Sequence, residues 1–225
     1  LGRLPATADA QVRAALEKVR AFESSVDSPR ALSVADNADA GGAFVTDGRR
    51  LLDAVPATWR TRALDLESMD LGELRDGLFE AFGEGLGWLN FYGHGGSDRL
   101  TSEGVLTTAD VSALPQSTQF PVVTALTCSA GRFEFPGAPS LAGALTLEAD
   151  RGAVATLTYS GLSFHSNSAA FGELFADALF RPHAGSRRLG DAVREAERHF
   201  LRRGGSDAHL RVLHLFGDPA LRLPE

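Results

Sequence analysis

Four short apolar stretches recur along the chain, and each is bounded by glycine or polar residues. They are residues 31–35 (ALSVA), 87–92 (GWLNFY), 120–127 (FPVVTALT) and 152–159 (GAVATLTY). Short continuous runs of aliphatic, β-branched and aromatic residues are typical of strands that are buried on both faces. The pattern therefore predicts four core strands of a mostly parallel sheet.

Apolar residues between these stretches recur every three or four positions, which is the spacing of an amphipathic helix. The predicted helices span residues 7–24, 71–82, 138–149, 166–180 and 188–201. Ser140 stands where it can lie in the first turn of its helix, and Gly204 where it can stop the last one. Three Gly- or Asp-rich stretches are predicted loops, at residues 36–48, 131–139 and 204–207, and Gly217-Asp218-Pro219 is a predicted turn that leads into a last strand.

Strands that alternate with helices indicate the α/β class, with helices on both faces of one mostly parallel sheet. In such sheets the reactive groups gather at the carboxyl ends of the strands. The residues that follow the four predicted strands are Asp36-Asn37, Gly93-His94-Gly95-Gly96, Cys128-Ser129 and Ser160-Gly161. A further helix, predicted over residues 107–114, would place His94 and Cys128 at the ends of neighbouring strands.

The residues at this edge of the predicted sheet suggest that His94 and Cys128 form a catalytic pair. A thiol with an ordinary pKa of about 8.5 is mostly protonated at neutral pH, so a nucleophilic cysteine needs a histidine nearby. The backbone N–H groups of Gly95 and Cys128 are candidates for holding an oxyanion. A lone cysteine is more often a small buried hydrophobe, but a cysteine and a glycine-flanked histidine at consecutive strand ends favour catalysis.

Composition narrows the classes of partner. The chain has 225 residues, of which 44% are apolar and 23% charged, and its net charge is -7. An acidic chain without a clustered basic face is a poor binder of nucleic acid, and no apolar run approaches the roughly 20 residues that span a bilayer. We therefore expect no nucleic-acid and no membrane partner. The one cysteine excludes an internal disulfide.

Several motifs together point to a known family. They are residues 1–5 (LGRLP), 33–44 (SVADNADAGGAF), 90–96 (NFYGHGG), 106–114 (LTTADVSAL), 121–134 (PVVTALTCSAGRFE) and 215–223 (LFGDPALRL). In their order and spacing they resemble the gingipain-type cysteine peptidases of the caspase-like group. The resemblance implies a caspase-like three-layer αβα sandwich, forming a single peptidase domain over residues 1–225 that is excised or processed from a longer chain.

The resemblance also implies roles for individual residues. Cys128 would attack the scissile carbonyl and form a thioester, and His94 would protonate the leaving amine. Gly95 and Cys128 would supply the amides of the oxyanion hole. Asp36, at the end of the first predicted strand, would support His94.

A preference for substrates with a basic P1 residue, as in the gingipains, would require an acidic pocket. Asp39 and Asp47 are the candidates for its floor, and the alternative for each is a solvated loop aspartate. Tyr159, Ser160 and Gly161 would line one wall of the pocket by position.

The resemblance further implies protein or peptide substrates, other domains of a longer precursor as partners, and a secreted or cell-surface bacterial enzyme, although one cysteine is compatible with a cytoplasmic location. Relatives bind structural calcium, but the acidic loops form no recognisable calcium site, so we predict no cofactor and no metal.

Two alternatives to an active cysteine peptidase stay open. One is a latent caspase-like module that binds or assembles until a partner activates it. The other is a serine hydrolase using Ser129 or Ser160, against which stands the missing G-x-S-x-G turn.

Overall fold

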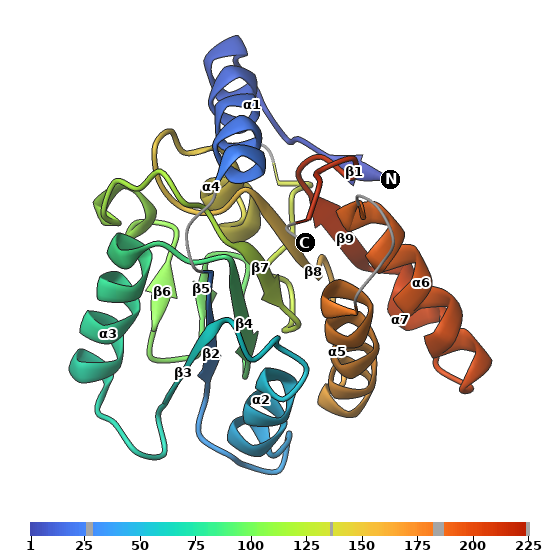
Figure 1. Cartoon of the computed structure of the whole chain (residues 1–225). Helices are drawn as coiled ribbons and strands as arrows, with labels where there is room; N and C mark the ends of the chain where they lie inside the picture. Colours follow the sequence, from blue (N-terminus) through green and yellow to red (C-terminus); the bar gives the residue numbers. More distant parts are fainter. Residues whose placement is uncertain (26–28, 136, 182–186, 224–225) are drawn as a thin grey trace.

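A seven-stranded sheet forms the middle layer of the protein (Figure 1). The computed structural model describes residues 1–25, 29–135, 137–181 and 187–223. In spatial order the strands are β1 (Gly2–Arg3), β9 (Leu213–Phe216), β8 (Ala155–Tyr159), β7 (Val122–Ala125), β4 (Trp88–Tyr92), β2 (Arg30–Ala35) and β3 (Arg60–Asp65). Neighbouring strands are parallel except β8 and β9. The predicted α/β class with a mostly parallel sheet is confirmed.

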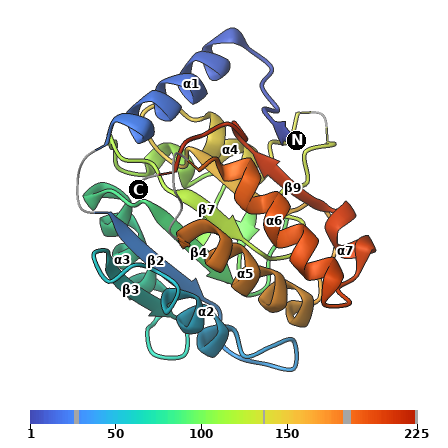
Figure 2. The same ribbon diagram turned by 45° about the vertical axis from the view of Figure 1, so that its right-hand side comes forward.

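Helices cover both faces of this sheet. One face carries α2 (Phe44–Leu52), α5 (His165–Phe180) and α6 (Leu189–Arg202), and the other carries α3 (Leu71–Glu84) and α4 (Leu141–Leu147). Figure 2 shows α5 and α6 side by side in front of the strands. Strand β4 contributes side chains to the hydrophobic cores on both faces of the sheet. Trp88 and Tyr92 pack into one core, and Leu89 and Phe91 pack into the other.

The two remaining helices lie at the margins of these layers. Helix α1 (Asp9–Ser24) packs on α4 (Figure 1), and α7 (Asp207–Arg211) precedes β9. Within α1, the buried Lys18 Nζ donates to the carbonyl oxygens of Leu145 at 3.0 Å and Arg151 at 3.2 Å. Burial lowers the pKa of Lys18 to about 7. These two hydrogen bonds tie α1 to the end of α4 and to the loop beyond it.

The predicted helix over residues 107–114 is wrong. Thr107 instead ends β6 (Leu106–Thr107), which pairs with β5 (Arg99–Leu100) in a two-stranded hairpin, and a single 3₁₀ turn follows at Val111–Ala113. The Asp110 carboxylate accepts hydrogen bonds from the backbone N–H and the hydroxyl of Thr107, and it forms an ion pair with Arg75. These contacts, the last of which reaches from α3, favour a turn over a continuous helix.

Three other boundaries differ from prediction. Residues 36–48 are not all loop, because α2 begins at Phe44 and buries Phe44, Val45, Gly48 and Leu51. Strand β3 was not predicted, because its first three residues are exposed and polar, as suits a strand at the sheet edge. The segment Gly217-Asp218-Pro219 follows the final strand instead of leading into it. Ser140 caps α4 through a hydrogen bond from the Gly143 amide at 3.2 Å.

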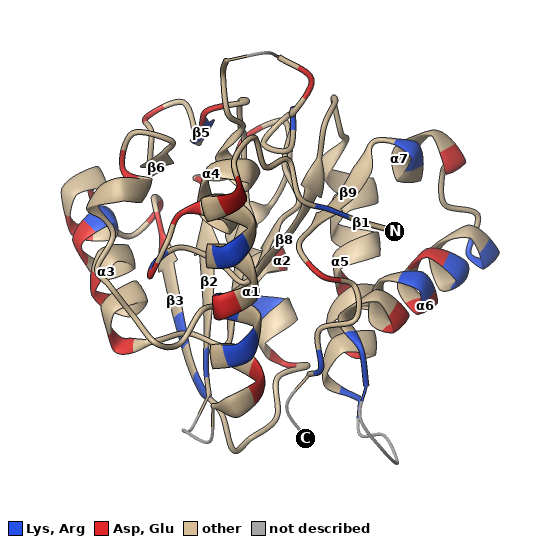
Figure 3. Cartoon of the chain, turned by 90° about the horizontal axis from the view of Figure 1, so that it is seen from above, with Lys and Arg blue, Asp and Glu red and all other residues tan. Residues whose placement is uncertain are grey.

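Charged residues of both signs are interspersed along α1, α3 and α6 (Figure 3). The strands carry few of them, in keeping with their burial. Among the described residues, no helix is both long and apolar enough to span a bilayer.

Candidate active site

His94 stands two residues beyond β4, where the chain turns under close packing. A Cβ atom on Gly93 would come within 2.4 Å of the Asp36 Cβ and 2.7 Å of the Phe91 ring, so only glycine fits there. The backbone N–H of His94 donates to Asp36 Oδ2 at 3.1 Å. Asp36 is buried, and this burial raises the pKa of its carboxyl group. Asp36 therefore holds the backbone of the histidine turn.

The imidazole ring of His94 is held by a different aspartate. Its Nε2 lies 2.9 Å from Asp39 Oδ2, and this hydrogen bond lowers the pKa of the Asp39 carboxyl group. Both side chains are open to solvent, with exposed fractions of 51% and 44%. Gly41 lies against the ring, and Phe44 meets it edge-on at 5.5 Å between centroids. Since Nε2 is engaged, Nδ1 is the nitrogen available for proton transfer.

Cys128 follows β7 in a strained turn. The next residue, Ser129, has a left-handed backbone with φ of 60°, which is costly for a residue with a side chain. Its N–H donates to Gly161 O at 3.0 Å. The half-buried Sγ accepts a hydrogen bond from the Ser163 N–H at 3.4 Å and lies 3.5 Å from the Ser163 carbonyl oxygen. The loop after β8 therefore fixes the position of the sulfur.

The histidine and cysteine turns touch each other directly. Strands β4 and β7 are neighbours, and Phe91 is paired with Ala125. Thr127 Oγ1 donates to Gly93 O at 2.6 Å. A Cβ atom on Gly95 would lie 3.1 Å from Cys128 O, so the backbones are in contact there. Within the described part of the chain, no hydrogen bond joins the two side chains, and the amides of Gly95 and Cys128 donate to no protein acceptor.

Asp47, the second candidate for an acidic pocket floor, is paired with another histidine. His165 Nε2 lies 2.8 Å from Asp47 Oδ2, and the exposed fractions of the two side chains are only 9% and 19%. Phe44 meets the His165 ring edge-on at 4.7 Å, and Tyr92 does so at 5.1 Å. The sequence carries no signal for this pair, because it depends on how α2 and α5 pack together.

The three residues predicted to line a pocket wall have other neighbours. Tyr159 is fully buried, with its hydroxyl 2.6 Å from His209 Nε2, so its side chain belongs to the core and not to a pocket wall. Ser160 Oγ lies 3.0 Å from His214 Nε2. Gly161 contributes its carbonyl oxygen to the cysteine turn. Gly161 therefore helps to hold the cysteine turn, whereas Tyr159 and Ser160 are paired with histidines.

Leu162 and Phe164 are the apolar side chains that this loop does expose. Their exposed fractions are 86% and 79%, and they flank Ser163, whose backbone contacts the Cys128 sulfur. Large apolar side chains exposed beside a reactive group indicate a binding surface.

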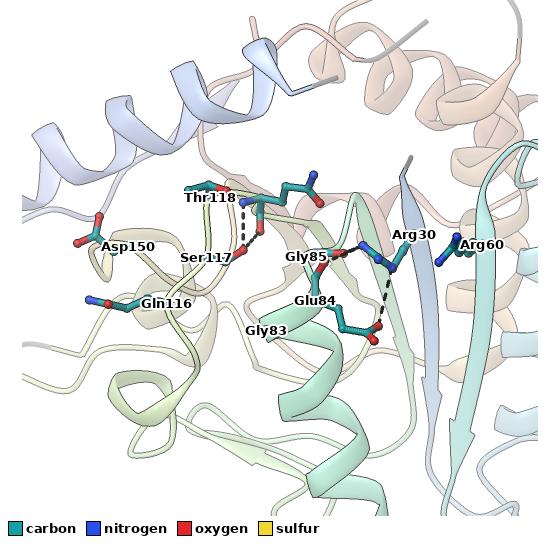
Figure 4. Close-up of a pocket in the computed structure, with 10 residues that line it drawn as sticks. Arg30, Arg60, Gly83, Glu84, Gly85, Gln116, Ser117, Thr118 and Asp150 are labelled. Carbon is teal, nitrogen blue, oxygen red and sulfur yellow. Dashed lines mark hydrogen bonds and ion pairs between the residues drawn. The ribbon is translucent and has the colours of Figure 1, made fainter. Parts of the chain in front are cut away.

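A pocket of about 840 Å³ lies away from these groups (Figure 4). Arg30 and Arg60, where β2 and β3 begin, line it together with Glu84 and Gly85 at the end of α3. It therefore opens at the amino ends of the strands, opposite Cys128. Among the described residues, no three His, Cys, Asp or Glu side chains gather as ligands for a metal ion.

Comparison with known structures finds the same fold in two structures of a gingipain. The Arg-specific cysteine proteinase gingipain R (RgpB) matches with a TM-score of 0.83 at 18% identity, and the Porphyromonas gingivalis complex of RgpB pro- and mature domains with 0.84 at 17%. Each match covers 99% of this chain and 55% or 56% of the other, so the chain spans about half the length of those proteins. The separase–securin complex of Saccharomyces cerevisiae matches at a TM-score of 0.56 and 11% identity, over 93% of this chain and 13% of that one.

These likenesses identify the caspase-like fold. No curated protein sequence matches the chain. The family model for peptidase family C25, in contrast, matches residues 1–224, nearly from end to end. The chain therefore belongs to peptidase family C25, the gingipain family.

Proposed function

We propose that this chain is a cysteine endopeptidase in which Cys128 is the nucleophile and His94 transfers the proton. The observation that carries the proposal is the contact between the two turns, in which Thr127 Oγ1 binds Gly93 O at 2.6 Å. Membership of a peptidase family supports a cysteine peptidase as the class. The assignment of the pair rests on the geometry of these turns.

The reaction would proceed in two steps. Cys128 Sγ attacks the scissile carbonyl carbon while the thiol proton passes to His94, and the C–N bond breaks as His94 protonates the leaving amine. Water then attacks the acyl carbon of the thioester and gives a proton to His94, and the C–S bond breaks as His94 returns that proton to the sulfur. Asp39, which is hydrogen-bonded to Nε2, would leave Nδ1 as the nitrogen that exchanges the proton.

The amides of Gly95 and Cys128 would stabilise the oxyanion of each tetrahedral intermediate. Backbone N–H groups with no protein acceptor are free to point at a developing negative charge, and one such donor contributes about 3 kcal/mol to catalysis. The contact of Gly95 with Thr127 and Cys128 O supports this role, because it holds the two amides near each other.

Two questions go beyond the class of enzyme: whether the site prefers a basic P1 residue, and whether the enzyme is latent. The basic preference predicted from the resemblance needs a free carboxylate, which is considered below. The latent alternative is favoured by one observation, namely that Sγ and the imidazole are each bonded elsewhere, to Ser163 and to Asp39. A labelling experiment separates a latent module from an active enzyme.

We expect a thiol-reactive peptide electrophile to add once to the folded protein, and to do so much faster than it adds to a small thiol at pH 6.5. The chain has one cysteine, so the intact mass reports modification of Cys128 without mapping. His94→Gln should slow the addition about a hundredfold, because an activated thiolate depends on its base. Folded protein that reacts no faster than a free thiol across the pH range would contradict the proposal and support the latent module.

Asp39→Asn is expected to lower kcat/KM for peptide hydrolysis by roughly tenfold to a hundredfold, because the imidazole loses a charged partner in a solvent-exposed pair. Steady-state kinetics would measure this. Asp36→Asn should cost less, because the asparagine oxygen can still accept from the His94 amide. Asp53→Asn, at an exposed position at the end of α2, is the matched control. A larger loss in Asp36→Asn than in Asp39→Asn would restore Asp36 as the support of His94.

A further inference from the structure

Two loops come together near the histidine and cysteine turns: the loop before α2, which packs against the rings of His94 and His165, and the loop before α5, which contacts the Cys128 sulfur. Helices α2 and α5 lie next to each other at the end of the sheet where β2 and β4 finish (Figures 1 and 2). The loop before α5 holds Ser163 against the sulfur, and His165 begins the helix two residues later. A substrate side chain next to the scissile bond would enter between these two loops.

Each of the two carboxylates that could attract a basic side chain there is already bonded to a histidine. Asp39 binds His94 at 2.9 Å, and Asp47 binds His165 at 2.8 Å. Arg50 stands 3.4 Å from the other oxygen of Asp47 and 3.2 Å from Glu173 on α5. Both carboxylates on this side of the site therefore already have partners within the protein.

His165 cannot leave Asp47 easily. Its ring is 9% exposed and lies edge-on to Phe44 and Tyr92. A third side is closed by Gly42, where a Cβ atom would come within 2.2 Å of His165 Cδ2. A guanidinium or ammonium group could bind Asp47 Oδ2 only by displacing this enclosed ring.

We infer that His165 is a specificity-determining residue that withholds Asp47 from the substrate, so that the site accepts an uncharged apolar P1 side chain packed against Leu162 and Phe164. This inference rests on the proposed function, and it replaces the basic P1 preference expected from the resemblance. The occupant fits the surface, because Leu162 and Phe164 are the exposed side chains nearest in sequence to the Ser163 contact with Cys128. An apolar side chain placed there removes exposed apolar area from water.

The test is a series of fluorogenic peptides that differ only at P1, compared by kcat/KM. For the wild-type protein we expect Leu or Phe at P1 to exceed Arg and Lys by at least tenfold. His165→Ala should uncover the Asp47 carboxylate and raise the Arg-to-Leu ratio of kcat/KM at least tenfold. The double variant His165→Ala/Asp47→Asn should return the ratio to its wild-type value.

Two controls keep the result interpretable. His165→Gln can still donate a hydrogen bond to Asp47 and should keep the wild-type ratio even if His165→Ala does not fold, and thermal unfolding would report on folding. His199→Ala, on α6, should change nothing. Wild-type cleavage after Arg or Lys would overturn the inference and leave the proposed function standing. A protein that neither cleaves nor reacts at Cys128 would overturn both.

Discussion

Replacement of Cys128 by alanine is expected to lower kcat/KM by at least about 10⁴-fold and to abolish labelling by electrophiles. The thioester cannot form without the sulfur, and what survives is the catalysis that the oxyanion amides and substrate binding supply alone. Initial-rate measurements on a peptide substrate with purified protein would show the loss. The thermal unfolding midpoint should barely move, because the half-buried sulfur makes only weak hydrogen bonds to Ser163.

Residual cleavage in the Cys128→Ala variant would redirect attention to a serine. Ser160 Oγ has a histidine nitrogen, His214 Nε2, at 3.0 Å. Burial lowers the pKa of His214, which favours the neutral ring that a base requires. Activity within a few fold of wild type, removed by a further Ser160→Ala substitution, would contradict Cys128 as the nucleophile. Cys128→Ala and Cys128→Ala/Ser160→Ala should instead be equally inactive.

His94→Ala is the second change with a large expected effect, a loss of about 10³-fold in kcat/KM. The variant lacks the group that accepts the thiol proton and protonates the leaving amine, so its rate should rise with hydroxide concentration where the wild-type rate does not. Added imidazole should restore part of the activity. The pH dependence of kcat/KM for the two proteins measures this difference.

A physical readout accompanies the kinetic one. The hydrogen bond from His94 is the largest cause of the lowered pKa of Asp39, so the pKa of that carboxyl group should rise towards its ordinary value in His94→Ala. Carboxyl titration by NMR would detect the shift. Unchanged hydrolysis in His94→Ala, with Asp39 titrating at its ordinary pKa, would show that the variant lost the bond but that the bond has no part in catalysis.

The sequence predicted the strands whose burial is two-sided. Strands β2, β4, β7 and β8 are continuous apolar runs, and the residues that follow them lie where parallel strands must place them. The same rule brought the turn of His94 next to the turn of Cys128, as their touching backbones show. Strand β3 escaped prediction, because an edge strand that starts Arg-Thr-Arg has no apolar run to recognise.

The carboxylates of the site could not be assigned from the sequence in the same way. Asp36 and Asp39 both follow β2, and only the fold of the intervening loop decides which one reaches the imidazole. A bridge between Asp39 and Gly42 closes that loop, and Gly41 packs under the ring. The pairing of Asp47 with His165 joins two residues that are 118 positions apart in the chain, and it depends on how α2 and α5 pack together. No local pattern encodes such a distance.

The sulfur of Cys128 is held in place by Ser163, but this chain has no second cysteine that could form a disulfide with it. A thiol that peroxide oxidises to the sulfenic acid is normally protected when a neighbouring thiol closes a disulfide with it. This chain contains one cysteine, so no such partner exists within it. The turn that places the sulfur beside Ser163 therefore also leaves the oxidised form exposed to further, irreversible oxidation. Reduction of the sulfenic acid therefore needs a thiol from outside this chain.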